Sequence, residues 1–252
     1  MILTIDIGNS DLVAILYDGQ GQILQRSRVK TARENIEDYY RKWAKDFCGS
    51  QSVDAWVLSC VVPGIFAQVN EVFKAFFHKE GLVISADKAP GFVCSLKNPS
   101  ELGADLVATA IGALAQYPAP ILIADLGSAG KITAINQDGV FVGGVIFPGL
   151  GSSLAGMASL IPHLPKIDLT LPETIIHTDT IPSMQSGLLY GYIAEVEGLL
   201  EKMDEELPGD CVRLLTGGYS NLLYPHFKRA LFVPDLLNDG LFEIYQRVNK
   251  KK

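Results

Sequence analysis

The stretch ILIADLGSAGK, residues 121–131, decides the fold of this chain. Four apolar residues run into a single acidic residue, Asp125, and small residues follow before a second apolar run begins. Apolar runs bounded by glycine-rich segments predict buried strands joined by a tight turn. A carboxylate at the end of a buried strand is costly unless its charge is needed there. The stretch therefore predicts a β-hairpin that presents Asp125 to a metal ion or a phosphate-bound cation.

The same pattern occurs near the N-terminus, where residues 2–10 read ILTIDIGNS and match residues 121–129 in type through the Asp-x-Gly. Each copy continues through a strand to an Asp-Gly turn, at residues 18–19 and 138–139. Similarity at an interval of half the chain predicts a duplicated unit. Two unrelated hairpins are the alternative, because Asp-Gly turns are common.

The composition is that of an ordinary globular protein, with 48% hydrophobic and 19% charged residues among 252. A net charge of −7 argues against a nucleic-acid or anionic-membrane partner. No apolar run approaches the roughly 20 residues of a membrane span, and Asp6 interrupts any signal-peptide pattern. The four cysteines form no C-x-x-C pair, which favours reduced thiols and a cytoplasmic location.

Strands and helices alternate along the chain, which predicts an α/β fold. The first half predicts strands at 2–5, 12–17, 22–29, 55–62 and 82–84, and amphipathic helices within 30–48 and 66–78. The second half predicts strands at 121–124, 132–135, 143–146 and 212–215, and helices at 152–160, 184–203 and 241–248. An Ala-rich helix at 102–117 lies between the halves. We therefore predict two domains, residues 1–117 and 118–252.

Two Asp-x-Gly hairpins facing each other across an interdomain cleft provide a physical means of holding ATP. Glycines let backbone N–H groups reach phosphate oxygens, and Asn9, Ser10 and Ser128 add side-chain donors. The carboxylates repel phosphate and so need Mg²⁺ or K⁺ between them. Residues 216–218, Thr-Gly-Gly, follow a buried strand and are a weak signal alone. Together these features predict two RNase H-like domains of the actin, sugar-kinase and Hsp70 ATPase type, with a nucleotide cleft between them.

A kinase also needs a group that accepts the proton of the attacking hydroxyl. Asp105 is the best candidate, because it lies in the first turn of the helix between the two halves. The helix dipole favours its ionised form there. The alternative is an ordinary first-turn aspartate, which is a frequent feature of helices.

The chain also resembles a known family nearly end to end. The motifs that carry the resemblance are, in order, Asp6-x-Gly8-Asn9-Ser10, Ser59-Cys60-Val61-Val62-Pro63, Asn98-Pro99-x-x-Leu102-Gly103-Ala104-Asp105, Asp125-x-Gly127-Ser128-Ala129, Gly143-Gly144-x-Ile146-x-Pro148-Gly149, Thr180 with Met184-Gln185-Ser186-Gly187, Tyr190-Gly191, Thr216-Gly217-Gly218 and Pro234-Asp235 to Tyr245. Several of these motifs are specific in combination. The series resembles the type III pantothenate kinases of bacteria.

The resemblance implies ATP-dependent phosphorylation of the primary alcohol of pantothenate to 4'-phosphopantothenate, the first step of coenzyme A biosynthesis. It implies Mg²⁺ at Asp6, a monovalent cation (K⁺ or NH₄⁺) at Asp125, and Asp105 as the base. ATP would contact Asp6, Ile7, Gly8, Asn9, Ser10, Asp11, Leu12, Val13, Ser128, Gly217 and Gly218. Pantothenate would contact Gly103, Ala104, Asp105 and Leu106, together with Thr180 across a homodimer interface. Helix 184–203 is a candidate for that interface.

Four positions depart from the family pattern. Leu106 stands where the family usually has Arg, and Leu96 where it usually has Tyr. The guanidinium fork of Arg suits a substrate carboxylate, and leucine cannot replace it. On the nucleotide side, Lys131 stands in place of Thr and Thr133 in place of Asp.

Position parity along the hairpin places Asp125 and Lys131 on similar faces, so the ammonium group of Lys131 can replace the bound cation. The alternative is that Lys131 points into solvent. Three functions are compatible with the departures. They are a pantothenate kinase with an altered pocket, a catalytically impaired paralogue that binds nucleotide or a partner, and a kinase for another small alcohol.

Overall fold

The structure is a computed structural model that describes residues 1–250, and the chain divides into two compact units. The first unit contains Met1–Gln116 and the C-terminal segment that begins at Asp235. The second unit is Tyr117–Pro234. Each unit has one mixed five-stranded sheet with helices, so the predicted α/β class is confirmed.

The sheet of the first unit has the strand order β3-β2-β1-β4-β5. The strands are β1 (Ile2–Ile7), β2 (Asp11–Tyr17), β3 (Ile23–Lys30), β4 (Ala55–Cys60) and β5 (Leu82–Val83). The helices are α1 (Ile36–Cys48), α2 (Pro63–Phe77), α3 (Ala104–Gln116) and α7 (Leu236–Lys250), with 3-10 turns at Ala86–Lys88 and Pro99–Glu101. β1, β2 and β3 are antiparallel, whereas β4 and β5 continue the sheet in parallel.

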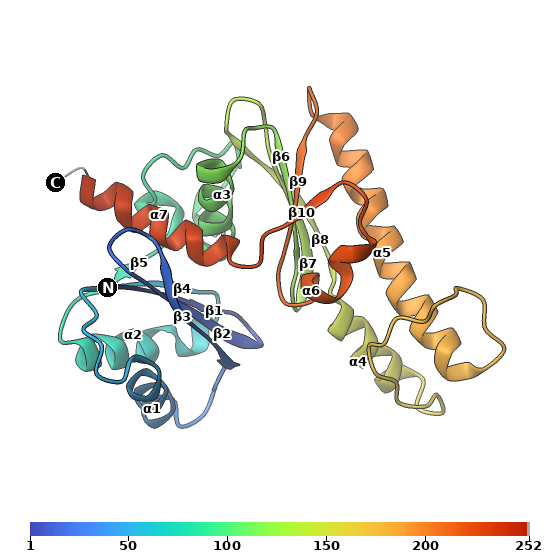
Figure 1. Cartoon of the computed structure of the whole chain (residues 1–252), viewed down its shortest axis with the longest axis horizontal. Coiled ribbons are helices and arrows are strands. Elements are labelled where there is room, and N and C mark those ends of the chain that lie inside the picture. The colour runs from blue at the N-terminus through green and yellow to red at the C-terminus, as the bar shows by residue number, and fades with distance from the viewer. Residues whose placement is uncertain (251–252) are drawn as a thin grey trace. The chain divides into compact units, whose positions relative to one another are not determined.

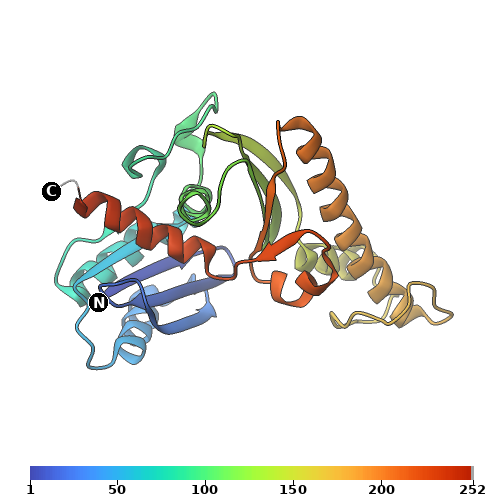
Figure 2. The same ribbon diagram turned by 45° about the horizontal axis from the view of Figure 1, so that its top comes forward.

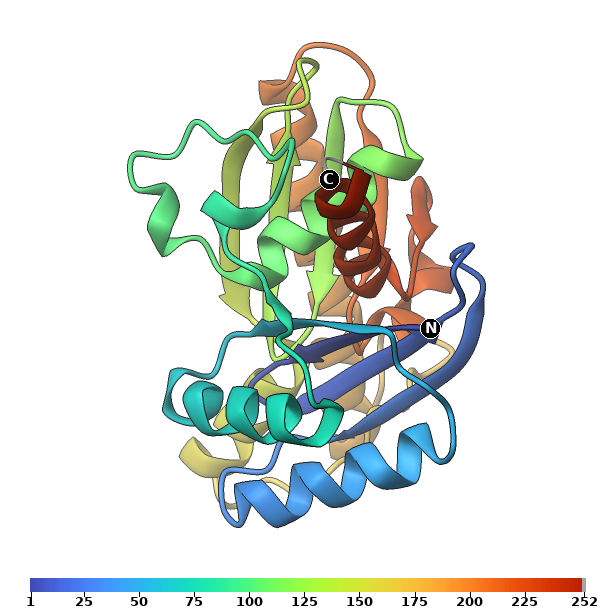
Figure 3. The same cartoon turned by 90° about the vertical axis from the view of Figure 1, so that its left-hand side faces the viewer.

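Helices cover both faces of this first sheet, α1 and α2 on one side and α3 and α7 on the other (Figures 1 and 3). The alternation of side chains along β1 divides the two cores. Leu3 and Ile5 pack with buried residues of α1 and α2, whereas Ile2 packs with α3 and α7. Asp6 has the parity of Ile2, and its side chain therefore lies on the α3 side of the sheet.

The sheet of the second unit has the strand order β10-β9-β6-β7-β8. The strands are β6 (Ile121–Leu126), β7 (Ala129–Ile135), β8 (Phe141–Pro148), β9 (Val212–Thr216) and β10 (Ala230–Phe232). The helices are α4 (Leu150–Leu160), α5 (Thr180–Glu206) and α6 (Ser220–Leu223), with a 3-10 turn at Tyr224–His226. The long helix α5 runs along one face of this sheet (Figure 2), where Leu189 and Val196 pack against Leu122 and Ala124.

The predicted duplication is confirmed, because the two sheets have the same order when β1 to β5 are matched with β6 to β10. β1 and β6 also share one pattern of burial along their length. The pairings of β2 with β3 and of β7 with β8 carry a register shift at the same place, between Leu16 and Tyr17 in the first unit and between Ala134 and Ile135 in the second. The structure therefore repeats a whole sheet, including its irregularity.

The predicted division at residue 117 assigned the C-terminal helix to the second domain. In the structure, α7 packs on α3 within the first unit. Small residues allow the two helices to approach closely. A Cβ on Gly240 would clash with the carbonyl group of Ala108, and one on Gly112 would clash with the carbonyl oxygen of Leu236. Thr4 adds a 2.8 Å hydrogen bond from its hydroxyl to Asn238 Oδ1.

Several predicted boundaries also move. β1 and β6 continue through Asp6 and Asp125, so both carboxylates belong to paired strands rather than to the turns. Pro63 opens α2 rather than closing the preceding strand, since proline suits the first turn of a helix. β10 and α6 are too short to show a periodic pattern. Among residues 1–250, no helix is long and apolar enough to cross a lipid bilayer.

Candidate active site

Asp6 lies in β1 with Ser59 directly opposite it on the parallel strand β4. The hydroxyl of Ser59 donates a 2.8 Å hydrogen bond to Asp6 Oδ1. Ser59 is fully buried, and Asp6 is half-buried. A buried donor bonded to a carboxylate fixes its orientation. The first sheet therefore holds the Asp6 carboxylate in one direction on the α3 side.

The turn after Asp6 is braced by its neighbours. The N–H of Gly8 donates to the carbonyl oxygen of Asp11 at 3.0 Å, which closes the turn. The hydroxyl of Thr31 donates to the carbonyl oxygen of Gly8 at 2.7 Å. Arg33 donates to Asn9 Oδ1 at 3.1 Å. These contacts hold an exposed glycine turn in one shape, as backbone recognition of phosphate requires.

Some side chains in the predicted ATP-binding stretch 6–13 serve the fold instead. Ile7 and Leu12 are fully buried in the core beneath α1 and α2, so only their backbone groups can contact a nucleotide. Asp11 forms ion pairs with Arg28 at 2.7 Å and Lys30 at 2.9 Å. Burial alone would raise the pKa of Asp11, but these two cations outweigh it and lower the pKa.

Asp105 lies in the first turn of α3, with its carboxylate folded over Gly103. The N–H of Leu106 donates to Asp105 Oδ1 at 2.9 Å. A Cβ on Gly103 would clash with that oxygen and would lie 3.7 Å from Val61 Cγ1. Val61 in turn donates its N–H to the carbonyl oxygen of Ile7 at 3.1 Å. The start of α3 therefore lies at the end of β1 that carries Asp6.

Asp125 lies opposite Lys131 in the antiparallel register of β6 and β7. Lys131 Nζ is 3.0 Å from Asp125 Oδ2, and the two side chains are 17% and 18% exposed respectively. The predicted shared face is confirmed, and the alternative that Lys131 points into solvent is wrong. Thr133 lies two residues further along β7 and is buried, directly opposite Ile123 and Gly144 on the neighbouring strands.

Two glycines from other segments, Gly217 and Gly149, lie close to the turn between β6 and β7. A Cβ on Gly217, which has a φ of +92°, would clash with Asp125 Oδ1. A Cβ on Gly149 would clash with the carbonyl oxygen of Ser128. The hydroxyl of Ser152, in the first turn of α4, donates to the same oxygen at 2.8 Å. Of the residues predicted to contact ATP, Gly217 therefore lies against the Asp125 carboxylate, Ser128 lies in the turn that follows Asp125, and exposed Gly218 directly follows Gly217.

The residues predicted to contact pantothenate are placed in both units. Gly103, Ala104 and Leu106 lie with Asp105 at the start of α3, and each is half-buried. Leu96 is half-buried in the loop before α3. Thr180 is the first residue of α5, in the second unit, and is exposed.

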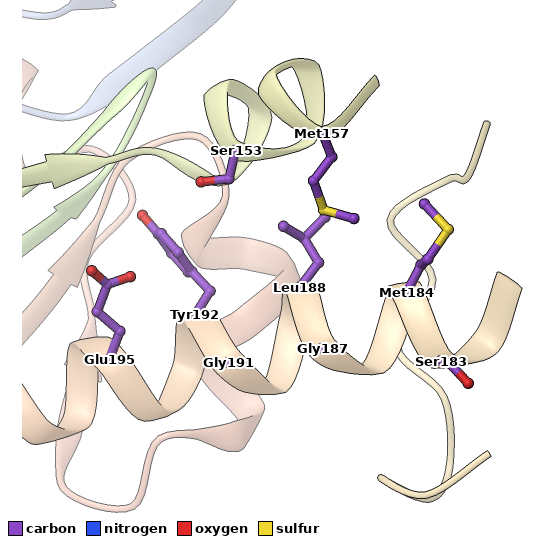
Figure 4. A pocket seen from close by; sticks show the side chains of 9 residues that line it. All are labelled: Ser153, Met157, Ser183, Met184, Gly187, Leu188, Gly191, Tyr192 and Glu195. Atoms are coloured by element: carbon purple, nitrogen blue, oxygen red, sulfur yellow. The ribbon is translucent and has the colours of Figure 1, made fainter. Parts of the chain in front are cut away.

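The second unit also contains a cavity of about 420 Å³ between α4 and the first half of α5 (Figure 4). Its lining residues are Ser153, Met157, Ser183, Met184, Gly187, Leu188, Gly191, Tyr192 and Glu195. Tyr192 is buried, and burial followed by the nearby Glu195 and Asp125 charges raises its pKa. Neither this cavity nor the position of Tyr192 in it has a signal in the sequence.

Sequence reasoning also missed the hydroxyls that orient the site. Ser59 lies near the end of β4, Thr31 directly follows β3, and Ser152 lies in the first turn of α4, each next to a predicted Asp-x-Gly turn. Ser59 had a detectable signal, because a parallel strand that ends beside Asp6 must place some side chain next to it. Thr31 and Ser152 had none, since their contacts depend on how β3 and α4 return to the turns.

The fold and the surroundings of Asp6 and Asp125 define the class of protein. The chain has the actin, sugar-kinase and Hsp70 ATPase fold, with an Asp-x-Gly hairpin in each unit. One solved relative in fold is a ROK family glucokinase from Streptomyces griseus in complex with glucose and AMPPNP, with a TM-score of 0.54, 12% identity and 99% of each chain covered. Another is the activator of 2-hydroxyisocaproyl-CoA dehydratase from Clostridium difficile with bound ADPNP, with a TM-score of 0.53, 12% identity, and 99% of this chain and 96% of that chain covered.

The family follows from sequence comparison. The family model for type III pantothenate kinase matches residues 2–202. A type III pantothenate kinase from Exiguobacterium sp. (strain ATCC BAA-1283 / AT1b) is 32% identical over 256 residues, covering 99% of this chain and all of that protein. The chain belongs to the type III pantothenate kinase family and is a phosphotransferase.

Proposed function

We propose that this chain transfers the γ-phosphoryl group of ATP to the primary alcohol of pantothenate, with Asp105 as general base. The observation that carries the proposal is the Asp105 carboxylate seated over Gly103, at the end of β1 that bears Asp6. The substrate oxygen bonds to the γ-phosphorus while its proton passes to Asp105. The bond from that phosphorus to the β–γ bridging oxygen breaks, and ADP leaves.

ATP and Mg²⁺ are the proposed co-substrate and metal. Mg²⁺ is bound through one or two carboxylates plus substrate phosphates rather than by a complete protein cage. Residues 1–250 fit that pattern, since they contain no cluster of three or more His, Cys, Asp or Glu side chains arranged to hold a metal. Asp6, oriented by Ser59, is the carboxylate that would hold Mg²⁺. Backbone N–H groups of residues 7–13 would contact the phosphates.

The second hairpin supplies the other nucleotide contacts in this proposal. Gly217 lies against the Asp125 carboxylate, Gly218 follows it in the chain, and Ser128 lies in the turn after Asp125. The charge of Asp125 must be neutralised before a phosphate can approach. The positive end of α4 supports an anion at the same turn, because Ser152 in its first turn contacts Ser128. A monovalent positive charge at Asp125 would complete this half-site. The candidates are K⁺, NH₄⁺ and the ammonium group of Lys131.

Pantothenate would bind at the start of α3, over Gly103, Ala104 and Leu106. Its carboxylate needs a cationic or hydrogen-bonding partner, which the apolar Leu106 cannot provide. We propose that this pocket differs from the family pattern on that side. Substitution of Leu106 by Arg would then lower the KM for pantothenate and leave the KM for ATP unchanged.

A homodimer through α5 is the proposed assembly, and Thr180 would reach the partner's pantothenate from the start of that helix. Gly187, Gly191 and Gly198 lie on α5 with open space where a Cβ would be, which allows a second helix to approach. Exposed apolar side chains include Ile181 in the first turn of α5 and Leu160 at the end of α4. Gly191→Arg would give monomers in sedimentation analysis and Gly191→Ala would not. We expect the protein to act in the cytoplasm.

The test is release of ADP by purified protein supplied with ATP, Mg²⁺ and pantothenate, with phosphopantothenate identified by mass spectrometry. Asp105→Asn should reduce turnover by about 10²-fold or more while ATP still raises the melting temperature. Absence of product from the wild type, with ATP still stabilising the protein, would overturn the kinase assignment and favour a nucleotide-binding paralogue. Turnover with another small alcohol would indicate a different substrate.

A further inference from the structure

The duplication provides an internal comparison for the two aspartates. Each has a hydroxyl residue opposite it on the parallel strand, Ser59 for Asp6 and Thr216 for Asp125. On the antiparallel side the two hairpins differ. Val13 lies opposite Asp6, whereas Lys131 lies opposite Asp125. The second hairpin has therefore placed a cation at the one neighbouring position where the first has an apolar residue.

The geometry of the Lys131–Asp125 pair indicates a mostly buried, fixed positive charge rather than a surface ion pair. Lys131 Nζ is 3.0 Å from Asp125 Oδ2, and both side chains are more than four-fifths buried. Strand pairing on both sides of β7 fixes the backbone of Lys131. A charged hydrogen bond in such a setting is stronger and less screened than one in open solvent. The ammonium group contacts Asp125 Oδ2, a carboxylate oxygen that a dissociable cation would need as a ligand.

We propose that Lys131 is a tethered cation that takes the place of a dissociable monovalent ion at Asp125. The inference rests on the proposed nucleotide-binding role of the second hairpin and disagrees with the K⁺ or NH₄⁺ that the family implies. A second monovalent cation at the same carboxylate would meet the ammonium as a like charge. Lys131 also acts as a positioning residue, because the other carboxylate oxygen lies against Gly217 of the loop 216–218.

The first arm of the test uses the wild-type protein. Calorimetric titration with Mg-ATP would be compared in choline, sodium, potassium and ammonium chloride at equal ionic strength. The expected dissociation constants agree within about twofold, because the positive charge at Asp125 is covalently attached. An affinity at least about tenfold higher in potassium or ammonium than in choline would overturn the inference.

The second arm uses Lys131→Met, which keeps the length of the side chain and removes its charge, with Lys131→Arg as the charged control. Lys131→Met should bind Mg-ATP about tenfold or more weakly in choline and recover in potassium or ammonium chloride. Lys131→Arg should show no such recovery. Lys131→Met that binds Mg-ATP like the wild type in every salt would overturn the inference.

The third arm needs neither nucleotide nor turnover. Crystals soaked in thallium acetate should show an anomalous peak at Asp125 in Lys131→Met and none there in the wild type. A peak beside Asp125 in the wild type would overturn the inference. If Lys131→Met does not fold, the wild-type salt series and the wild-type thallium map decide the question. If the protein fails to phosphorylate pantothenate but gives the expected thallium maps, the proposed substrate is wrong and the role of Lys131 stands.

Discussion

Ser59 and Asp6 lie directly opposite each other on two parallel strands, and the hydroxyl of Ser59 donates a 2.8 Å hydrogen bond to the Asp6 carboxylate. The donor is fully buried and the acceptor is half-buried. A residue that carries no charge therefore sets the direction in which a proposed metal ligand points. Removing such an outer contact typically costs about 10- to 100-fold in metal affinity or activity.

Ser59→Ala should weaken the productive binding of Mg-ATP. The expected result is a rise of about tenfold or more in the KM for Mg-ATP, with the KM for pantothenate unchanged, because Asp6 loses its fixed orientation. Steady-state kinetics at varied Mg²⁺ would measure it. Asp6→Asn is the matched control and should be more damaging. An unchanged Mg²⁺ dependence in Ser59→Ala would contradict the role of Asp6.

Gly103→Ala should impair catalysis without unfolding the protein. A Cβ at residue 103 would clash with Asp105 Oδ1, so the carboxylate must rotate away from its place over the helix start. We expect kcat to fall by about 10²-fold, as for other misplaced catalytic groups. Gly64→Ala is the control, because a Cβ at that position in α2 meets no atom within 4 Å. Wild-type kcat in Gly103→Ala would argue against Asp105 as the base.

The ion pair between Asp204 and Arg213 should stabilise the second unit at neutral pH. Arg213 lies on β9 and donates to Asp204 Oδ2 at 2.6 Å, at the end of α5. Burial alone would raise the pKa of Asp204, but hydrogen bonds from Cys211 and Arg213 outweigh it and lower the pKa. This stability is therefore present above pH about 4, the ordinary carboxyl range, and is lost as the pH falls through the lower folded pKa.

Arg213→Met should lower the free energy of unfolding by about 2 kcal/mol, because Asp204 stays half-buried and loses the charged donor that Arg213 provides. Urea denaturation at pH 7 would measure the change. Combining it with Asp204→Leu should restore much of the loss, since an apolar pair can replace a buried ion pair. A double variant no more stable than Arg213→Met alone would show that the loss has another cause.

Ionisation of Asp239 should lower the free energy of unfolding as the pH rises. It lies on α7 and accepts a 2.8 Å hydrogen bond from the hydroxyl of Tyr17 on β2. Burial raises the pKa of Asp239 above its usual range, and the bond from Tyr17 lowers it in part. A raised folded pKa means that the folded state binds the proton more tightly. Its contribution is therefore full below pH about 4 and is lost as the pH rises through the folded pKa.

Urea midpoints measured from pH 4 to pH 7 test this assignment. Asp239→Asn should show a smaller loss of stability over that interval than the wild type, because it has no proton to release. Tyr17→Phe should show a larger loss, because Asp239 then lacks the bond that lowers its pKa. Identical pH profiles for the wild type and Asp239→Asn would remove Asp239 as the titrating group.

Much of the fold was predictable because its signals are local. The apolar runs before Asp6 and Asp125, the following glycines and the Asp-Gly turns were enough to predict both hairpins and their duplication. The Ala-rich composition of α3 predicted a helix between the halves, and the structure shows that it packs on α7. That partner was not predictable, since the fit of Gly112 to Gly240 joins segments more than 120 residues apart.

Part of the candidate site was likewise predictable from sequence, and part required the structure. Position parity placed Lys131 on the face of Asp125 but left open whether it pointed into solvent. The answer required the register of β6 and β7, which the length of their turn sets. The hydroxyls of Thr31 and Ser152 could not be assigned from sequence, because each reaches its acceptor only after a nonlocal element has returned to the turn.

The sequence by itself determined the two Asp-x-Gly hairpins, the α/β class and the family, because these follow from short-range periodicity and motif spacing. Only the tertiary structure decided that α7 completes the first unit, that Gly103 makes room for the Asp105 carboxylate, and that Lys131 forms an ion pair with Asp125. Each of these depends on side chains from separate strands or helices meeting within a few ångströms. Such distances are set by packing and strand register over the whole sheet, and no local pattern contains them.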